Sequence, residues 1–269
     1  MNVMESPPPN APGHRIGFTL VELIVTITII AVLASLSFVA LRNVRTSARS
    51  ATCVNNIKQI IATHNILAQE TGGVIVHPWA SVIQGSELRN WSEFHTIQLS
   101  DDFDWLQPVS DVNERMRNME YLRCPTAYAL QRSEMARLND HRGWRTYGLN
   151  QKIGLNQDPD PSLRAWTDGA RTVIEVVSPS KLVLVSEGGW EGSRNRYPGA
   201  IGPEAENAGY AGFHGGGFHV GYLDGHVERH TADTFLLTGK TLPNGQVGQW
   251  TNPEFALMWR GRLTPREVE

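Results

Sequence analysis

The stretch FTLVELIVTITIIAVLASLSFVAL, from Phe18 to Leu41, decides the fold of this 269-residue chain. Its 24 residues include a single charged side chain, Glu22, and neither proline nor glycine. A helix rises about 1.5 Å per residue, so this length spans roughly 36 Å, more than the ~30 Å hydrocarbon core of a bilayer. The sequence therefore predicts a membrane-spanning helix near the N-terminus.

The surrounding residues leave three interpretations of this stretch. A polar, proline-rich leader, MNVMESPPPNAPGHRIG, precedes it. A cleaved secretory signal is the first interpretation, because Ser35-Leu36-Ser37 loosely resembles a cleavage site, although the apolar run is long for a signal. An ordinary membrane anchor is the second, but it leaves Glu22 without a function, and a carboxylate near the bilayer centre costs about 2.5–3.5 kcal/mol. The third starts from the residues around Glu22.

The string Gly17-Phe18-Thr19-Leu20-Val21-Glu22 resembles the processing site of type IV prepilins and type II secretion pseudopilins. The resemblance implies that a prepilin peptidase cleaves after Gly17 and that the new N-terminal Phe18 is N-methylated. It also implies that Glu22 neutralises the terminal amine of a neighbouring subunit during filament assembly. The residues suit this role, because a buried carboxylate needs a buried cation and cleavage before Phe18 creates one.

The helical pattern continues beyond Leu41. Apolar residues recur there mostly three or four positions apart, at Val44, Ala48, Ala51, Val54, Ile57, Ile61, Ile66 and Ala68. The pattern predicts one helix from Phe18 to about Glu70, roughly 80 Å long and amphipathic in its second half, ended by Thr71-Gly72-Gly73. We therefore expect a leader over 1–17, a transmembrane helix over 18–41, an amphipathic extension of it over 42–70 and a periplasmic globular head over 71–269.

Short segments separated by glycine, proline, asparagine and aspartate make up the predicted head. Residues 173–177 and 181–186 are typical of strands, and residues 110–120 and 129–139 have weak helical patterns. Asp224-Gly225 lies between two alternating runs and predicts a two-residue hairpin turn, which pairs His219 with His230 and Gly221 with Glu228. We expect a small antiparallel sheet packed on the long helix, an α+β, pilin-like fold.

The segment HGGGFHVGYLDG, from His214 to Gly225, has a histidine, nine residues and then Asp-Gly. This spacing resembles the H-X9-DG signature of a pseudopilin-like family abundant in planctomycete-type bacteria. Other segments also resemble that family: CVNNIKQI from Cys53, YLRCP around Cys124, YGLN from Tyr147 and PSKLVLVSE ending at Glu187. The resemblance implies a fold and a mode of assembly, and it says less about a biochemical role. We expect Asp224 and Gly225 to form the turn, and His214 to hydrogen-bond a backbone group or a carboxylate.

Two sets of residues are candidate metal ligands. With the expected pairing, four side chains share one face of the hairpin, where they could bind Zn²⁺ or simply form a solvated polar face: His219, His226, Glu228 and His230. Asp158 and Asp160 alternate with Asn156 in a loop, and oxygen ligands at that spacing suit Ca²⁺. The sequence otherwise predicts no cofactor.

Cys53 and Cys124 are the two cysteines of the chain. In an oxidising periplasm a disulfide between them would join helix and head and contribute about 4 kcal/mol for so long a loop. The alternative is a pair of separate thiols.

Charge and motifs restrict the function. The chain has 24 basic and 27 acidic residues and no basic run, which disfavours nucleic acid as a partner. It contains no nucleophile elbow, P-loop, His-Glu-x-x-His or dinucleotide motif, so we predict that it is not an enzyme. The resemblances imply a single-pass inner-membrane pseudopilin with a periplasmic head, partnered by a prepilin peptidase, an N-methyltransferase and other pilins or pseudopilins in type II secretion or a type IV pilus-like system. The alternative is a membrane-anchored periplasmic binding or metal-binding protein that acts through its head.

Overall fold

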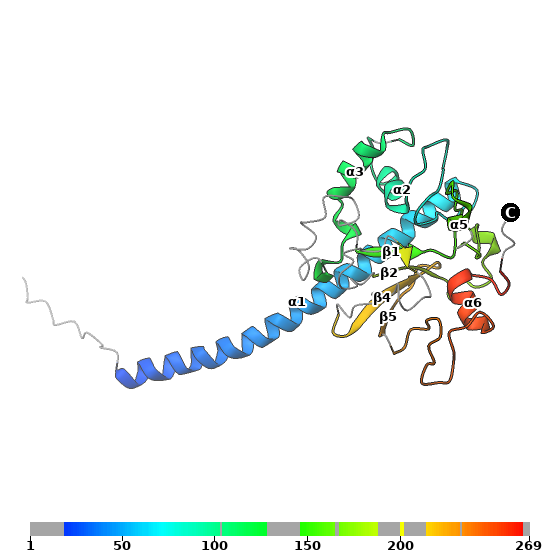
Figure 1. Cartoon of the computed structure of the whole chain (residues 1–269). Helices are drawn as coiled ribbons and strands as arrows, with labels where there is room; N and C mark the ends of the chain where they lie inside the picture. Colours follow the sequence, from blue (N-terminus) through cyan, green and yellow to red (C-terminus); the bar gives the residue numbers. More distant parts are fainter. Residues whose placement is uncertain are drawn as a thin grey trace, which may run out of the picture. The chain divides into compact units, whose positions relative to one another are not determined.

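The computed structural model describes residues 19–102, 104–127, 146–164, 167–187, 200–201, 214–231 and 233–265. The chain divides into two compact units, residues 1–45 and residues 46–269. Helix α1, Leu20–Glu70, contributes residues to both units, which confirms the predicted long N-terminal helix (Figure 1).

The first unit consists, in its described part, of the apolar half of α1. Thr19 and Glu22 begin the helix with reciprocal hydrogen bonds, in which the Thr19 backbone N–H and hydroxyl donate to Glu22 Oε2 (2.9 and 2.8 Å) and the Glu22 N–H donates to Thr19 Oγ1 (3.2 Å). The large apolar side chains are exposed on every side of the helix, from Leu20 (73% exposed) to Val44 (64%). Among the described residues, α1 is the one helix long and apolar enough to cross a membrane.

The second unit is built on a five-stranded sheet with the strand order β3-β1-β2-β4-β5. Its strands are β1 (Tyr147–Asn150), β2 (Val183–Glu187), β3 (Ala200–Ile201), β4 (Gly217–Tyr222) and β5 (Val227–Thr231). Neighbouring strands are antiparallel except β1 and β3, which are parallel. The α+β class with a small, largely antiparallel sheet is therefore confirmed.

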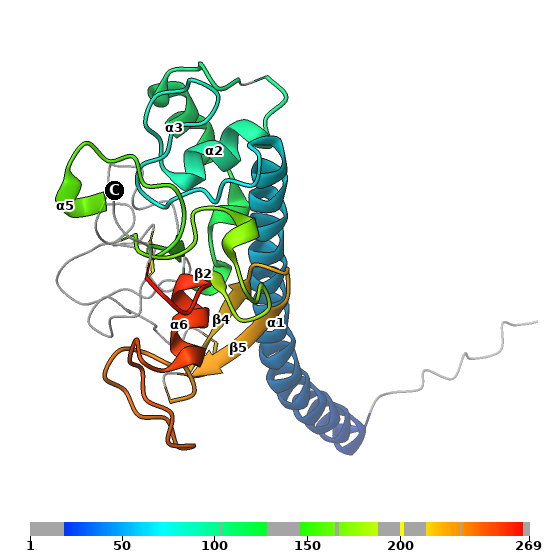
Figure 2. The same cartoon turned by 90° about the vertical axis from the view of Figure 1, so that its right-hand side faces the viewer.

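One face of this sheet packs against the part of α1 that follows Thr46 (Figure 2). Cys53, Ile57 and Ile61 of α1 are buried in the core formed there. Gly221 of β4 makes this approach possible, because a Cβ at that position would lie 2.5 Å from Ile57 Cγ2 and 2.7 Å from Ile61 Cδ1. Helix and sheet thus meet where the strand has no side chain.

The opposite face carries a second core covered by helix α6, Pro253–Arg260. Phe218, Val220 and Tyr222 of β4 point into it together with Trp259 of α6. The Asn150 side-chain amide donates to the carbonyls of Val183 (2.8 Å) and Trp259 (2.9 Å), which fixes α6 to the central strands. The sheet therefore lies between two helices, and its strands β1, β2 and β4 are buried on both faces, whereas the edge strand β5 is partly exposed.

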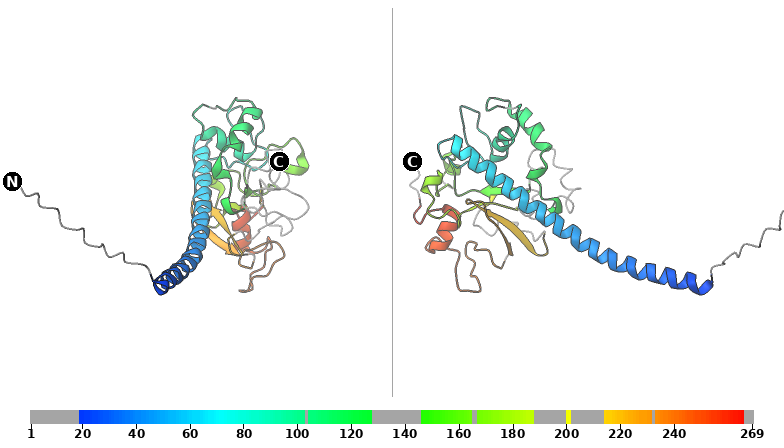
Figure 3. Two further views of the ribbon diagram at one scale, coloured as in Figure 1. Left: turned by 90° about the vertical axis from the view of Figure 1, so that its left-hand side faces the viewer. Right: turned by 180° about the vertical axis from the view of Figure 1, so that it is seen from behind.

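The other helices among the described residues are short: α2 (Trp91–Gln98), α3 (Val109–Arg117), η1 (Glu120–Leu122), α5 (Pro161–Arg164) and η3 (Val173–Glu175). Figure 3 shows α2 beside the C-terminal end of α1, where the Gln98 amide donates to Glu70 Oε1 at 3.1 Å. The helix predicted over 110–120 is confirmed as α3, and the one predicted over 129–139 lies outside the described residues.

The strand predicted over 173–177 is wrong, whereas the one predicted over 181–186 is confirmed as β2. Residues 173–175 form the 3₁₀ helix η3, closed by a bond from the Val176 N–H to the Val173 carbonyl (3.3 Å). The Glu175 carboxylate accepts the Arg171 N–H at 3.1 Å, and Ile174 is 90% exposed. β-branched residues alone did not make a strand here, because the local hydrogen bonds close a turn instead.

The predicted hairpin exists, but its predicted register is wrong by one residue. Gly221 pairs with Val227 and His219 pairs with Arg229. The loop has three residues rather than two, since the Tyr222 N–H donates to the His226 carbonyl (3.0 Å) and Gly225 adopts a φ of 100°. A one-residue shift reverses the faces of a strand, so His219 points toward α1 and His230 points to the other side.

Candidate functional site

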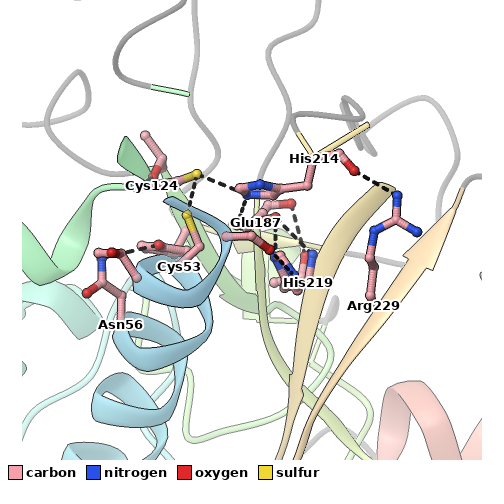
Figure 4. Close-up of polar contacts among 12 residues, drawn as sticks. Cys53, Asn56, Cys124, Glu187, His214, His219 and Arg229 are labelled. Atoms are coloured by element: carbon pink, nitrogen blue, oxygen red, sulfur yellow. Dashed lines mark hydrogen bonds and ion pairs between the residues drawn. The ribbon is translucent and has the colours of Figure 1, made fainter. Parts of the chain in front are cut away.

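Four chemically reactive side chains from distant parts of the chain meet inside the second unit (Figure 4). One atom from each lies within 4.8 Å of the others, and all four residues are buried: Cys53, Cys124, Glu187 and His214. Among the described residues this is the one group of three or more such side chains gathered closely enough to hold a metal ion. We call it the Cys/Glu/His cluster.

Local structure positions both cysteines. Cys53 lies on the face of α1 that packs on the sheet, one turn before Ile57. Cys124 follows η1, and its backbone N–H donates to Thr146 Oγ1. The Asn56 amide of α1 donates to the Arg123 carbonyl at 2.9 Å, which holds the segment carrying Cys124 against the helix.

The other two members come from the ends of strands. Glu187 is the last residue of β2 and pairs with Tyr147 of β1. His214 precedes β4, and its carbonyl accepts a hydrogen bond from Arg229 Nη2 at 2.7 Å. Gly215 and Gly216, with φ of 63° and 82°, turn the backbone between His214 and the strand, a conformation that residues with a side chain rarely adopt.

The contacts within the cluster are short. The Sγ atoms of the free cysteines Cys53 and Cys124 are 2.7 Å apart. Cys124 Sγ lies 3.4 Å from His214 Nε2, which lies 2.9 Å from Glu187 Oε1. The structure thus brings together the two cysteines predicted to pair and places the Glu187–His214 pair against them.

A further histidine holds the second carboxylate oxygen. Glu187 Oε2 accepts the His219 backbone N–H at 2.8 Å and lies 3.2 Å from His219 Nδ1. His219 Nε2 in turn lies 3.2 Å from Ser50 Oγ on α1. The carboxylate is therefore fixed on both oxygens, one toward the cluster and one toward His219.

The electrostatics of the cluster are set by burial and mutual contact. Burial raises the pKa of Glu187, but the hydrogen bonds and charges of His214 and His219 outweigh it and bring that pKa to about 2. Burial lowers the pKa of His214, while its contacts with Cys124 and Glu187 raise it to about 9. The contact between the sulfurs lowers the pKa of Cys124 and raises that of Cys53. These contacts therefore favour the charged forms of Glu187, His214 and Cys124 and the neutral thiol of Cys53.

An open groove of about 710 Å³ reaches His214 from the surface of the second unit. The α1 side of the groove mixes polar residues such as Ser50 and Lys58 with the apolar Ala51 and Val54. Gly215 and Arg229 line the opposite side with His214. The groove gives small solutes a route to the edge of the otherwise buried cluster.

Comparison with known proteins identifies the N-terminal signal. Residues 14–38 match the family described as the prokaryotic N-terminal methylation motif, and this range contains Gly17, Phe18 and Glu22. No curated protein and no solved structure matches the chain. The chain thus carries a prepilin-type signal and has the features of a type IV pilin-like or pseudopilin-like precursor. Its resemblance to the H-X9-DG family stays a prediction.

The structure describes the predicted signal and motif residues in part. Gly17 and Phe18 lie outside the described residues. Asp224 Oδ1 accepts the His226 backbone N–H at 3.1 Å, so Asp224 and Gly225 form the hairpin loop. His214 lies at the other end of β4 and bonds the carboxylate of Glu187, a contact of the kind expected for it.

The predicted four-residue face of the hairpin is wrong, because His219 lies on the opposite side of the sheet from the other three. Glu228 lies 3.3 Å from His230 Nε2 and 3.8 Å from His226 Nε2. His230 also contacts Tyr222, whose hydroxyl lies 3.0 Å from its Nε2, so it packs at the edge of the second core. A two-residue turn would have put His219 on the same face as the other three residues, but the loop has three residues.

Hydrogen bonds within the acidic loop explain why polar side chains alternate there. Asn156 Oδ1 accepts the Asp158 N–H (3.0 Å), Asp158 Oδ1 accepts the Asp160 N–H (2.9 Å), and Asp160 Oδ1 accepts the Ser162 N–H (2.9 Å). Successive side chains thus bond the backbone two residues ahead and lead into α5. The alternating carboxylates serve these turns, and calcium binding stays an untested prediction.

The sequence suggested that the two cysteines pair and that His214 bonds a backbone group or a carboxylate, but it did not place His214 beside the cysteines and gave Glu187 no chemical role. The signal was present: a carboxylate ends an apolar run, LVLVSE, that forms a central strand. A buried carboxylate requires a partner, which is the argument that points from Glu187 to a cation or a histidine.

Proposed function

We propose that the chain is a structural, non-enzymatic subunit of a filament of the type II secretion or type IV pilus-like class. The observation that carries the proposal is the methylation motif over residues 14–38. In this proposal a prepilin peptidase removes residues 1–17, Phe18 is N-methylated, and residues 18–41 hold the subunit in the inner membrane. The 42–70 extension and the 71–269 head then stand on the periplasmic side and join sibling subunits.

The exposed apolar surface of the first unit supports this assignment. The side chains that need lipid or neighbouring helices are Leu20, Val21, Leu23, Ile24, Val25, Ile27, Ile29, Ile30, Val32, Leu33, Leu36, Phe38, Leu41 and Val44. Full burial of one such side chain contributes about 1.5–3 kcal/mol, so the total driving force is tens of kcal/mol. A bilayer provides this burial before assembly, and packing of helix against helix provides it in a filament.

Glu22 supplies the specificity that apolar burial lacks. In the unprocessed chain its carboxylate is satisfied by Thr19 at the helix start. Cleavage after Gly17 would create a cationic amine on Phe18 and make Glu22 the fifth residue of the processed chain. In an apolar environment an amine from a neighbouring subunit is the partner that a buried carboxylate requires, and this pairing would set the register between subunits.

Mass spectrometry of the mature N-terminus, on protein from the native host, tests the proposal. N-methyl-Phe18 is the expected terminus, and Gly17→Val should retain the leader. A terminus at Phe38 would mean ordinary secretion, and an intact Met1 would leave only a membrane anchor; either result would refute the proposed processing.

Assembly is tested separately from processing. Glu22→Ala should be cleaved normally but should be lost from filaments, because removing one partner of a buried ion pair costs about 3–5 kcal/mol. Thr26→Val is the matched control in the same apolar stretch, since the Thr26 hydroxyl bonds only the Leu23 carbonyl of its own helix (2.8 Å). Equal incorporation of both variants would contradict the assigned role of Glu22.

A further inference from the structure

We propose that the Cys/Glu/His cluster is a structural site for one divalent metal ion of the zinc class. Its donors are two sulfurs, one imidazole nitrogen and one carboxylate oxygen. Such mixed sulfur and nitrogen sets select Zn²⁺ over Ca²⁺ and Mg²⁺, which prefer sites made of oxygen alone. The site shares no residue with either metal set that the sequence suggested.

The spacing of the donors suits a four-coordinate ion. Bond lengths of about 2.3 Å to sulfur and 2.0–2.1 Å to nitrogen or oxygen place tetrahedral ligand atoms roughly 3.3–3.8 Å apart. The Cys124–His214 distance of 3.4 Å already falls in this range, and the His214–Glu187 distance is 2.9 Å. The sulfurs, 2.7 Å apart, would separate by about 1 Å to admit the ion.

The surroundings orient the donors as the outer contacts of a metal site do. His219 holds Glu187 Oε2 through its backbone N–H at 2.8 Å and leaves Oε1 turned toward the cluster. Ser50 lies beside the far nitrogen of His219 at 3.2 Å. Arg229 holds the His214 carbonyl at 2.7 Å. Partners of this kind fix a ligand's direction and commonly change metal affinity 10–100-fold.

Charge gives the reason for an ion at this place. Cys53 and Glu187 are almost completely shielded from solvent, with exposures of 0% and 1%. As metal ligands the two cysteines would be thiolates, so together with the Glu187 carboxylate they would carry three negative charges into the core, and the ligating imidazole of His214 is neutral. A divalent cation neutralises most of this charge and bonds all four donors, whereas burying the charges unpaired would be costly.

A disulfide between Cys53 and Cys124 is the competing state, since it would use both sulfurs and prevent metal binding. The sulfurs are 2.7 Å apart and free in this structure, against about 2.05 Å in a disulfide bond. A disulfide is neutral and needs no imidazole or carboxylate beside it. A metal ion would give His214 and Glu187 a direct role beside the sulfur pair, which a disulfide would not.

The ion would join three parts of the second unit that are far apart in sequence. Cys53 contributes α1, Cys124 contributes the segment after η1, and Glu187 and His214 contribute the sheet. The groove that ends at His214 gives a metal ion or a chelator access. The proposed role is thus to fix the amphipathic half of α1 to the head.

The test uses the full chain, purified in detergent under reducing conditions without added metal. Elemental mass spectrometry should find close to one equivalent of zinc per chain. After removal of the zinc with a chelator, added Co²⁺ should give the thiolate-to-cobalt charge-transfer band and the strong visible bands of a tetrahedral sulfur-ligated ion. A second preparation, made without reductant and then denatured and alkylated, counts the free thiols independently.

Variants connect the ion to the cluster. Cys53→Ser, Glu187→Gln and His214→Gln should each lose the stoichiometric zinc and the cobalt bands, while the half-exposed His226→Gln should keep both. Glu187→Gln preserves side-chain size, and circular dichroism identifies any variant that fails to fold. A folded wild type without zinc, a disulfide in its unreduced form, or zinc retained by all three variants would each overturn the proposal.

Discussion

Acidification should destabilise the second unit through His64 of α1. Its ring is completely buried, and within the described residues neither nitrogen has a hydrogen-bond partner. The ring of His95 of α2 packs edge-on against it, with ring centroids 6.1 Å apart. Burial lowers the pKa of His64 from 6.5 to about 4, and burial together with the charge of His64 lowers the pKa of His95. The native state thus holds these rings neutral.

The sign and size of the effect follow from these values. Because the folded pKa of His64 lies below the unfolded value, the unfolded chain binds more protons between pH 6.5 and pH 4. The stability that neutral His64 contributes is therefore fully present above pH 6.5, and the free energy of unfolding falls as the pH drops toward 4. Between pH 7 and pH 5 the loss from His64 alone is about 2 kcal/mol. For a unit of this size that lowers the melting temperature by roughly 4–8 °C.

Thermal unfolding of the full chain in detergent at pH 7 and pH 5 measures this loss. His64→Phe keeps a ring but cannot titrate, so its drop in melting temperature between the two pH values should be smaller than that of the wild type by that amount. The difference between pH values is the quantity compared, so any packing change in the variant cancels. His226→Gln, at the surface, should behave like the wild type. Equal acid losses in wild type and His64→Phe would refute the reasoning.

Three further outcomes can be measured. Gly221→Ala should lower the free energy of unfolding by about 1–3 kcal/mol in thermal or urea unfolding, because its Cβ would meet Ile57 and Ile61. Ile61→Val should recover part of that loss in a double-mutant cycle, and full additivity of the two changes would contradict the predicted clash. His219→Ala keeps the backbone N–H but removes the ring, whose Nδ1 lies 3.2 Å from Glu187 Oε2, so it should weaken zinc binding 10–100-fold in chelator competition without abolishing it, and an unchanged affinity would remove the positioning role of the ring. Chelation of the wild type should lower its melting temperature but leave Glu187→Gln unaffected, whereas equal shifts would indicate a non-specific effect.

Much of the fold was predictable because it depends on local patterns. Apolar spacing over residues 18–70 predicted α1 almost to its observed ends, Leu20–Glu70. The alternating runs on either side of Asp224 predicted the β4–β5 hairpin. The segment 173–177 was mispredicted because its composition favours a strand, while its observed bonds run to its own residues and to Arg171.

The candidate site was less predictable because it depends on long-range contacts. Its members come from α1, the segment after η1, β2 and the turn before β4, and no local pattern indicates that such segments meet. Cys53 and Cys124 are 71 residues apart, and His214 follows Cys124 by a further 90. The predicted metal-binding face of the hairpin was wrong because the loop has one residue more than predicted. With the observed pairing His219 lies opposite Arg229 and on the side of the sheet that faces α1.

The three-residue loop also gives a structural reason for the number of residues between His214 and Asp224 in this chain. Asp224 closes the loop at one end of β4, and alternation back along the strand then directs Gly221 and His219 toward α1. Gly221 admits the helix, His219 reaches Glu187, and the two-glycine turn returns the chain so that His214 reaches the same carboxylate. Removing one residue between the turn and the loop would place Val220, a residue of the second core, against α1. The spacing therefore fixes the strand's faces and the cluster together, and a deletion in β4 should disrupt zinc binding and the packing of α1 at once.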